Sequence, residues 1–323
     1  MSYLTDLTLR LAAGAALIDP EIRQTHGSWL LSQQRSDGGF AGREGDSDPY
    51  YTAFALRGLL IVDGIDEDVA QRAAGFFAET FSDSLGIVDL VSLVMGASIL
   101  ELTQGINPLT DIPDARQRVL AKLEALRSSD GGYAKTVGGV AGSTYQTFLN
   151  LLCYELLEAQ PPEPDAILRF LHGQRVIDGG FREIRVAKRA GVNPTAAGIG
   201  ALKSLGRLDP GAEEATIEFL ADMRTDEGGL SANDRISLAD LLSSCTGMVT
   251  MADLQAVDQL HLPGLRRYAL SMQRLEGGRP AGGFHGFAFD QEVDVEYTFY
   301  GLALLALCEA YLAESTDAAG ASR

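Results

Sequence analysis

Two kinds of helical pattern alternate along the chain. In one kind, apolar residues fall on a single face, as in VLAKLEALR, ILRFLHGQR and TIEFLADMR. In the other, the stretch is apolar nearly all round, as in YYTAFALRGLLIV, LVSLVMGASILEL and DVEYTFYGLALLAL. An amphipathic helix lies at a surface, whereas a helix that is apolar on every side is buried. The pattern therefore predicts an all-α protein with outer and inner helices.

A glycine turn precedes most of the inner stretches. It reads SDGGF at residues 36–40, SDGGY at 129–133 and IDGGF at 177–181. Glycine allows the positive φ values that a tight reversal requires. We expect the glycines to be structural, the aspartates to accept bonds from nearby backbone amides, and the aromatic residue to be buried between units.

The turns divide the chain into six units of roughly 50 residues. The residues that close the complete turns are spaced 93, 48, 49 and 54 positions apart. They are Phe40, Tyr133, Phe181, Leu230 and Phe284. A degenerate turn, SDSLGIVDL, fills the long first interval. Because the inner helices are too apolar to face water, we predict that about six helical hairpins close into a ring. The repeats span about 20–312 of a single domain, 1–323, and we expect the tail 313–323 to be disordered.

A cap residue is expected at the start of each inner helix. The six expected positions are Asp48, Val88, Ser143, Asn193, Asp240 and Asp294. All but Val88 are preferred N-caps, because a side-chain oxygen accepts a bond from a free amide of the first turn. If the inner helices run parallel, these ends gather at one rim.

The net charge and the amino-acid composition limit the binding partners and cellular locations that we expect. The net charge of −18 would repel nucleic acid, so no nucleic-acid partner is expected. Cys153, Cys245 and Cys308 lie far apart in apolar stretches, which indicates reduced, buried thiols and a cytoplasmic location. No run of 18 apolar residues occurs, so no transmembrane segment is expected. An acid precedes the first base near residue 10, which is the wrong order for a secretory signal.

Three stretches carry a resemblance to a known family: SQQRSDGGFAGREGDSDPYYTAFALRGL, GSTYQTFLNLL and GGFHGFAFDQEVDVEYTFYGLALLAL. The repeat resembles that of the β subunits of protein prenyltransferases and, more distantly, that of the terpenoid cyclases sharing the α/α toroid. The resemblance implies an all-α α/α toroid with a central cavity for an isoprenoid small molecule. It also makes a helical, α-subunit-like protein a candidate partner.

In the protein prenyltransferases, zinc is held by an Asp, a Cys two residues later and a His of the last inner helix. The matching positions here are Asp240, Leu242 and Tyr297. Zinc binds nitrogen, sulfur or oxygen, so we expect a zinc-independent protein with no metal at these three positions. Asp240, Asp294 and Tyr297 are the candidate catalytic residues. Asp240, Asp294 and Glu296 could hold a proton or Mg²⁺ if they crowd together, and helix capping is the alternative role of each aspartate.

A basic cluster in the loop FREIRVAKRAGVN is the candidate diphosphate site. It consists of Arg182, Arg185, Lys188 and Arg189. Guanidinium groups beside a helix N-terminus suit a diphosphate. A solvated basic loop that pairs with surface acids is the alternative.

Aromatic residues gather on the first, third and sixth inner helices, whereas the fourth and fifth carry small residues, AAGIGA and SSCTG. The residues expected to line the cavity are Tyr51, Phe54, Tyr145, Phe148 and Tyr300. An aromatic wall facing small side chains predicts a pocket for a long apolar chain, and ordinary core packing is the alternative.

The sequence therefore predicts a prenyltransferase-like protein that binds an allylic diphosphate of the farnesyl or geranylgeranyl type, and it leaves open whether the protein is an enzyme. A non-catalytic ligand-binding or scaffold toroid is one alternative. A terpenoid cyclase-like enzyme is another, although the D-x-D-D motif of such enzymes is missing.

Overall fold

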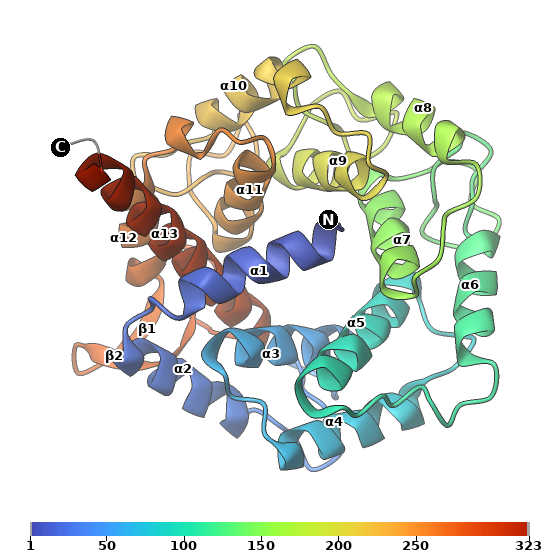
Figure 1. Ribbon diagram of the computed structural model, residues 1–323, viewed down its shortest axis with the longest axis horizontal. Coiled ribbons are helices and arrows are strands. Elements are labelled where there is room, and N and C mark those ends of the chain that lie inside the picture. The colour runs from blue at the N-terminus through green and yellow to red at the C-terminus, as the bar shows by residue number, and fades with distance from the viewer. Residues whose placement is uncertain (1, 322–323) are drawn as a thin grey trace.

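The computed structural model describes residues 2–321, with side chains as far as residue 315. Six helices of this part form an inner ring, and six more lie around them (Figure 1). The inner helices are α3 (Pro49–Val62), α5 (Ile87–Gln104), α7 (Thr144–Leu156), α9 (Val192–Ser204), α11 (Leu241–Asp253) and α13 (Val295–Ala321). The outer helices are α2 (Pro20–Ser32), α4 (Glu67–Thr80), α6 (Ala115–Ala125), α8 (Pro164–Gln174), α10 (Glu214–Asp222) and α12 (Leu262–Ser271). Each inner helix packs against the next, and α13 packs against α3. The predicted ring of six hairpins is confirmed.

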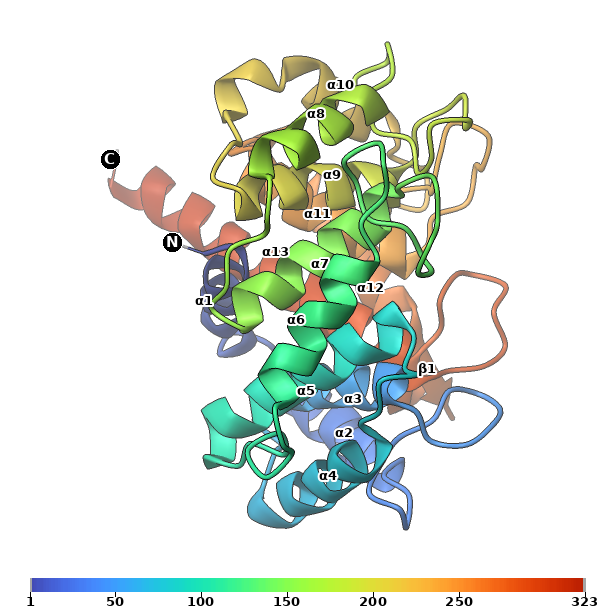
Figure 2. The ribbon, with the colours of Figure 1, turned by 90° about the vertical axis from the view of Figure 1, so that its right-hand side faces the viewer.

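Helix α1 (Tyr3–Ala15) stands outside the repeat and crosses one end of the ring (Figures 1 and 2). It packs along α13 and touches α3 and α9. Arg10 pairs with Asp253 at 2.8 Å, Lys203 pairs with Asp253 at 2.6 Å, and Lys203 also contacts Asp6. Because Lys203 and Asp253 lie at the C-terminal ends of α9 and α11, α1 covers the end of the ring opposite to the glycine turns.

Smaller elements complete the described chain. Strands β1 (Gln273–Glu276) and β2 (Arg279–Phe284) form an antiparallel hairpin at the sixth turn. Two short 3₁₀ helices span Pro210–Ala212 and Val257–Gln259. Helix α13 extends to Ala321 and so includes most of the tail 313–323, whose disorder stays a prediction. Residues 322 and 323 lie outside the described part.

The glycine turns have the structural role that the sequence predicts. At the third complete turn Gly179 has φ +93°, and a Cβ there would lie 2.1 Å from the carbonyl oxygen of Ala215. Asp178 accepts the amide of Gly180 at 3.2 Å, and Phe181 is fully buried. The arrangement recurs with Asp37, Gly39 and Phe40 in the first turn and with Asp130, Gly132 and Tyr133 in the second.

A repeated hydroxyl ties each complete turn to its inner helix. The amide of Tyr133 donates to Oγ1 of Thr147 at 3.0 Å, and this hydroxyl donates to the carbonyl of Ser143 at 2.7 Å. The turn-and-hydroxyl pairs are Phe40–Thr52, Tyr133–Thr147, Phe181–Thr195, Leu230–Ser244 and Phe284–Thr298. The side-chain hydroxyl thus gives the buried backbone amide of the turn residue a hydrogen-bond acceptor.

Four of the six expected caps do cap their helices. They are Asp48, Ser143, Asp240 and Asp294, each of which accepts the amide three residues later. The expectation is wrong for Val88 and Asn193. Helices α5 and α9 begin earlier, behind Gly86 and Gly191, so the true cap in both units is a glycine without a side-chain oxygen. Val88 and Asn193 lie inside the first helical turn.

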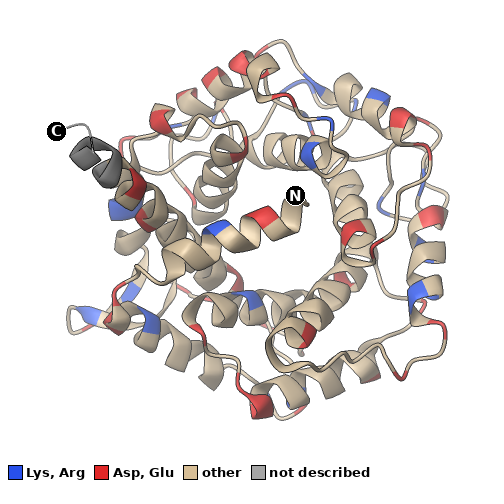
Figure 3. Cartoon of the chain, in the orientation of Figure 1, with Lys and Arg blue, Asp and Glu red and all other residues tan. Residues whose placement is uncertain are grey.

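Charged residues lie mainly on the outer helices and at helix ends, and the inner ring is largely uncharged (Figure 3). Two described helices have the length and apolar composition of a membrane span, namely α5 and the 295–315 part of α13. Both are walls of the ring, with 50% and 67% of those windows buried inside the protein. Their hydropathy is accounted for by their place in the core.

Candidate functional site

The inner helices enclose a central cavity of about 370 Å³. Its wall repeats the same helical positions in every unit, counted from the cap residue. The second position after the cap contributes Tyr50, Val88, Tyr145, Asn193, Leu242 and Glu296. The fifth and sixth positions form a middle layer, and the ninth contributes Arg57, Met95, Leu152, Val249 and Ala303. Residues three or four apart share one face of a helix, so the wall consists of three stacked layers.

Helix α1 forms the floor of the cavity. Its Tyr3, Leu4, Leu7 and Leu11 line the end beside the ninth-position layer. The opposite end opens among the N-termini of the inner helices, where Tyr145 keeps 38% of its surface exposed. A ligand would therefore enter from the side of the glycine turns.

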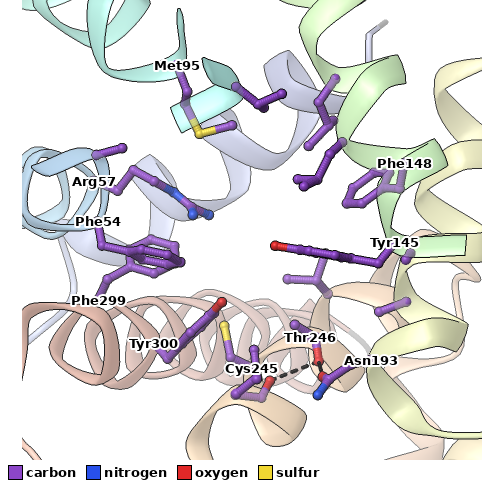
Figure 4. A pocket seen from close by; sticks show the side chains of 18 of the residues that line it. Phe54, Arg57, Met95, Tyr145, Phe148, Asn193, Cys245, Thr246, Phe299 and Tyr300 are labelled. Atoms are coloured by element: carbon purple, nitrogen blue, oxygen red, sulfur yellow. Dashed lines mark hydrogen bonds between the residues drawn. The ribbon is translucent and has the colours of Figure 1, made fainter. Parts of the chain in front are cut away.

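Aromatic rings dominate two sides of the cavity (Figure 4). Phe54 and Tyr300 lie with ring centroids 5.4 Å apart, and Tyr145 and Phe148 lie across the cavity from them. All four belong to the lining that the sequence predicts. Tyr51 does not line the cavity: a Cβ at Gly42 would lie 2.5 Å from its ring, so it points toward the turn loop.

Arg57 places a positive charge inside this apolar space. Its guanidinium lies 3.8 Å from the ring centroid of Phe299 and 5.1 Å from that of Phe54. Figure 4 shows the side chain pointing into the cavity. Among the described residues it has no hydrogen bond and no ion pair. Sequence analysis did not single out Arg57, although it is a lone charge within YYTAFALRGLLIV.

Glu296 is the carboxyl at the cavity wall nearest the ring closure. The Tyr50 hydroxyl donates to its Oε1 at 2.6 Å. Removal from water raises the pKa of Glu296, and the nearby Asp294 carboxylate adds to this, while the Tyr50 bond and the charges of Arg57 and Arg43 oppose it. The carboxyl group therefore holds a proton more readily than one in water.

The three candidate catalytic residues lie beside the cavity, outside its lining. Asp240 accepts the backbone amide and the hydroxyl of Ser243, at 2.6 and 2.8 Å. Asp294 caps α13 and pairs with Arg43 at 2.8 Å, and Tyr297 lies under the same guanidinium at 5.7 Å. Cap geometry turns both carboxylates toward their own helices. Their contacts are structural.

The residues at the family's zinc positions do not fit zinc. Leu242 presents a hydrocarbon side chain to the cavity, and the carboxylate of Asp240 is engaged by Ser243. Among the side chains that the structure describes, no three of His, Cys, Asp or Glu lie close enough to hold a metal ion. The same observation gives no support within this part of the chain for a Mg²⁺ site at Asp240, Asp294 and Glu296.

The four residues of the basic cluster do not share one environment in the structure. Arg182 donates to the carbonyl of Gly173 at 2.8 Å, and Arg189 pairs with Asp234. Arg185 and Lys188 are exposed, and neither has an ion pair within the described residues. None of the four lines the cavity, so only Arg185 and Lys188 are free to meet a ligand at the rim.

Comparison with protein-family models establishes the family to which the chain belongs. The model of the prenyltransferase alpha-alpha toroid domain matches residues 8–78 and 90–320. The chain belongs to this family. The toroid domain thus includes all six hairpins and most of α1. No curated protein matches the chain in a sequence comparison.

Solved structures show how widely this toroid is shared. Candida albicans protein geranylgeranyltransferase-I, complexed with GGPP, is similar with a TM-score of 0.69 and 16% identity, over 88% of this chain and 90% of that one. The type II terpene cyclase MstE from Scytonema has a TM-score of 0.59 and 12% identity, over 91% and 98% of the two chains. An α-1,6-mannanase from Salegentibacter also has a TM-score of 0.59, with 14% identity over 91% and 99%. These likenesses show the fold of the toroid and not its activity.

Proposed function

We propose that the protein binds an isoprenoid chain in the central cavity. The observation that carries the proposal is the layered wall, in which aromatic and aliphatic side chains surround about 370 Å³ closed at one end by α1. A deep apolar cavity with few polar groups suits a long hydrocarbon chain. The geranylgeranyltransferase, whose structure contains GGPP, and the terpene cyclase give this ligand class its support among proteins of similar fold.

Binding can be tested with a cavity-filling variant. Ala196 lines the cavity from α9, so Ala196→Phe should fill part of the space and weaken binding of farnesyl or geranylgeranyl ligands at least about ten-fold. Ala12→Trp on the exposed face of α1 is the matched control and should bind as the wild type does. Native mass spectrometry and calorimetry measure both. Equal binding by the two variants would place the ligand elsewhere, and no binding by the wild type would refute the proposal.

Zinc-dependent transfer to a cysteine is disfavoured by the contacts of Asp240, Leu242 and Tyr297 described above. A prenyl transfer to another acceptor, or storage and delivery of the ligand without chemistry, both use the same cavity. A helical partner protein, as in the protein prenyltransferases, would meet the rim, where Arg185 and Lys188 are exposed. These two residues are the alternative place for the diphosphate of a ligand, at the rim instead of inside the cavity. A cytoplasmic location remains our prediction.

A second candidate function is cyclisation of the bound chain, started by a proton. Glu296 favours it, because a buried carboxyl with a raised pKa at the wall of an aromatic cavity can act as an acid. The carboxyl proton would pass to an alkene carbon, leaving a carboxylate and a carbocation that the aromatic rings of the cavity wall stabilise. Loss of a proton from a neighbouring carbon would restore the acid. Glu296→Gln should then abolish turnover of geranylgeranyl substrates while leaving their binding intact, and unchanged turnover would exclude Glu296 as the acid.

A further inference from the structure

We propose that Arg57, Tyr145 and Tyr300 form an oxyanion-binding site in the middle of the central cavity, so that an amphiphilic ligand binds with its acidic group inside the ring. The inference rests on the proposed function for the identity of the apolar chain. It adds the chemical class of the polar end and the place where that end binds. Figure 4 shows the guanidinium and the two phenol hydroxyls pointing into the same open space.

Arg57 supplies the charge. A helical side chain leans toward the N-terminus of its helix, which places the guanidinium at the level of Phe54 and Phe299 in the middle layer, above the floor. The ring faces attract the cation, but they accept none of its five N–H hydrogen bonds. Arg57 is half-buried and has no protein acceptor among the described residues, so its N–H groups are available to a ligand that enters the cavity.

Tyr145 and Tyr300 supply neutral donors on two further helices, α7 and α13. Neither hydroxyl has a hydrogen-bond partner among the described residues. Burial raises the pKa of both phenols, so both keep their protons. The carboxyl group of Glu296, which also faces the cavity, is already bonded to Tyr50, and that of Glu183 is bonded to Ser143. None of these oxygens bonds to Arg57, Tyr145 or Tyr300, so the three donors have no hydrogen-bond partner among the described residues.

This donor set selects an oxygen anion. A carboxylate or a phosphate offers two or more acceptor oxygens to an Arg and two hydroxyls. The aromatic and aliphatic wall around the site disfavours a free, fully hydrated ion, so the anion is expected to be attached to an apolar chain. Carboxylate and diphosphate are two sources of the same chemistry, and the experiment separates them.

The experiment compares the affinities of five probes. Farnesol, farnesoic acid and farnesyl diphosphate share one chain and differ in the head group, while dodecanoate and dodecyl phosphate carry the anion on a chain that is not an isoprenoid. Calorimetry is carried out with the wild type, with Arg57→Met, with Tyr300→Phe, and with Arg185→Ala combined with Lys188→Ala as the rim control. Thermal melting verifies that each variant is folded.

We expect the wild type to bind at least one anionic farnesyl probe about ten-fold more tightly than farnesol, and Arg57→Met to remove that advantage while leaving farnesol unchanged. Tyr300→Phe should lose a smaller part, and the rim control should lose nothing. A preference for farnesoic acid identifies a carboxylate, and a preference for farnesyl diphosphate identifies a diphosphate.

Several outcomes separate the inference from the proposed function. If farnesol binds as tightly as the anionic probes, or if only the rim control loses affinity for the anions, the inner site is refuted and isoprenoid binding stands. If dodecanoate or dodecyl phosphate binds through Arg57 and no farnesyl probe binds, the inner site stands and isoprenoid binding is refuted. If no anionic probe depends on Arg57, the inference is wrong.

Discussion

The Tyr50 hydroxyl donates a 2.6 Å hydrogen bond to Oε1 of Glu296, and this bond joins the first inner helix to the last. It lies at the seam where the ring closes and at the wall of the cavity. The same contact therefore bears on stability and on the chemistry available to a ligand.

Glu296 should make stability depend on pH. Because burial raises its pKa above the ordinary 4.5, the folded protein holds this proton more tightly than the unfolded chain. Its contribution is fully present below the unfolded pKa and is lost as the pH rises through the folded pKa. Glu296→Gln keeps an oxygen for Tyr50 and removes the charge, so it should stabilise the protein more at pH 8 than at pH 4. Melting temperatures across this range test it, and a difference that does not vary with pH would contradict it.

His26 should act in the opposite direction. Its Nδ1 accepts the amide of Gly283 at 3.1 Å, so Nε2 carries the hydrogen and donates to Oε1 of Gln273 at 3.0 Å. Burial lowers the pKa of His26 from 6.5 to about 4. The stabilising contribution is present above pH 6.5 and is lost as the pH falls toward 4, by at most about 3 kcal/mol. Chemical denaturation of the wild type and of His26→Gln at pH 7.5 and pH 5 measures it. If both proteins lose the same stability, another group is responsible.

Glycines at two nearby positions should respond differently to alanine. At Gly179, with φ +93°, a Cβ would lie 2.1 Å from the carbonyl oxygen of Ala215. Gly179→Ala should cost at least about 1–3 kcal/mol of unfolding free energy from backbone strain, with more from the clash. At Gly173, in α8, a Cβ meets nothing within 4 Å, so Gly173→Ala should be neutral or stabilising by up to about 1 kcal/mol. Urea denaturation compares the two, and similar effects would show that the turn tolerates a side chain.

The hydroxyl group of Thr147 should contribute more to the stability of the fold than its methyl group does. Thr147→Val keeps the shape of the side chain but leaves the buried amide of Tyr133 without a partner. A loss of about 1–3 kcal/mol is expected. Thr147→Ser keeps the hydroxyl and serves as the control, so its loss should be smaller. Denaturant titration decides, and the reverse order would mean that packing outweighs the hydrogen bond.

The metal content of the protein should be negligible. Leu242 and Tyr297 supply no sulfur or imidazole ligand, so protein purified without chelator should contain no stoichiometric zinc after dialysis. Elemental analysis measures this directly. Leu242→Cys combined with Tyr297→His is the matched comparison and should retain more zinc than the wild type. One zinc per chain in the wild type would overturn the expectation.

The ring could be predicted from the sequence because its signals are local and repeated. Each complete turn carries its glycines and a buried closing residue, and each inner helix is apolar on all sides. The cavity wall was harder to place, because it depends on the register between units. Glycine replaces the usual cap at Gly86 and Gly191, which shifted the expected register at Val88 and Asn193 by two residues.

The pattern of hydrophobic and polar residues does not predict which distant segments contact each other. The charge on Arg57 is visible in the sequence, but its contact with Phe299 of α13, a helix far away in the chain, is not. For Asp240 and Asp294 the sequence left capping and catalysis open, because both roles use the same residue types.

The position of helix α1 also affects the order in which the parts of the protein fold. Arg10 reaches Asp253 across 243 positions of sequence, and α1 packs along the last helix, α13. Contacts between such distant segments form late, since they require ordering of a long intervening chain. The cavity floor should thus be the last part of the molecule to become native, and until then the apolar interior of the half-built ring is accessible to other unfolded chains. We therefore expect the docking of α1 to close this end of the ring, and the pairs Arg10–Asp253 and Asp6–Lys203 to hold it in place.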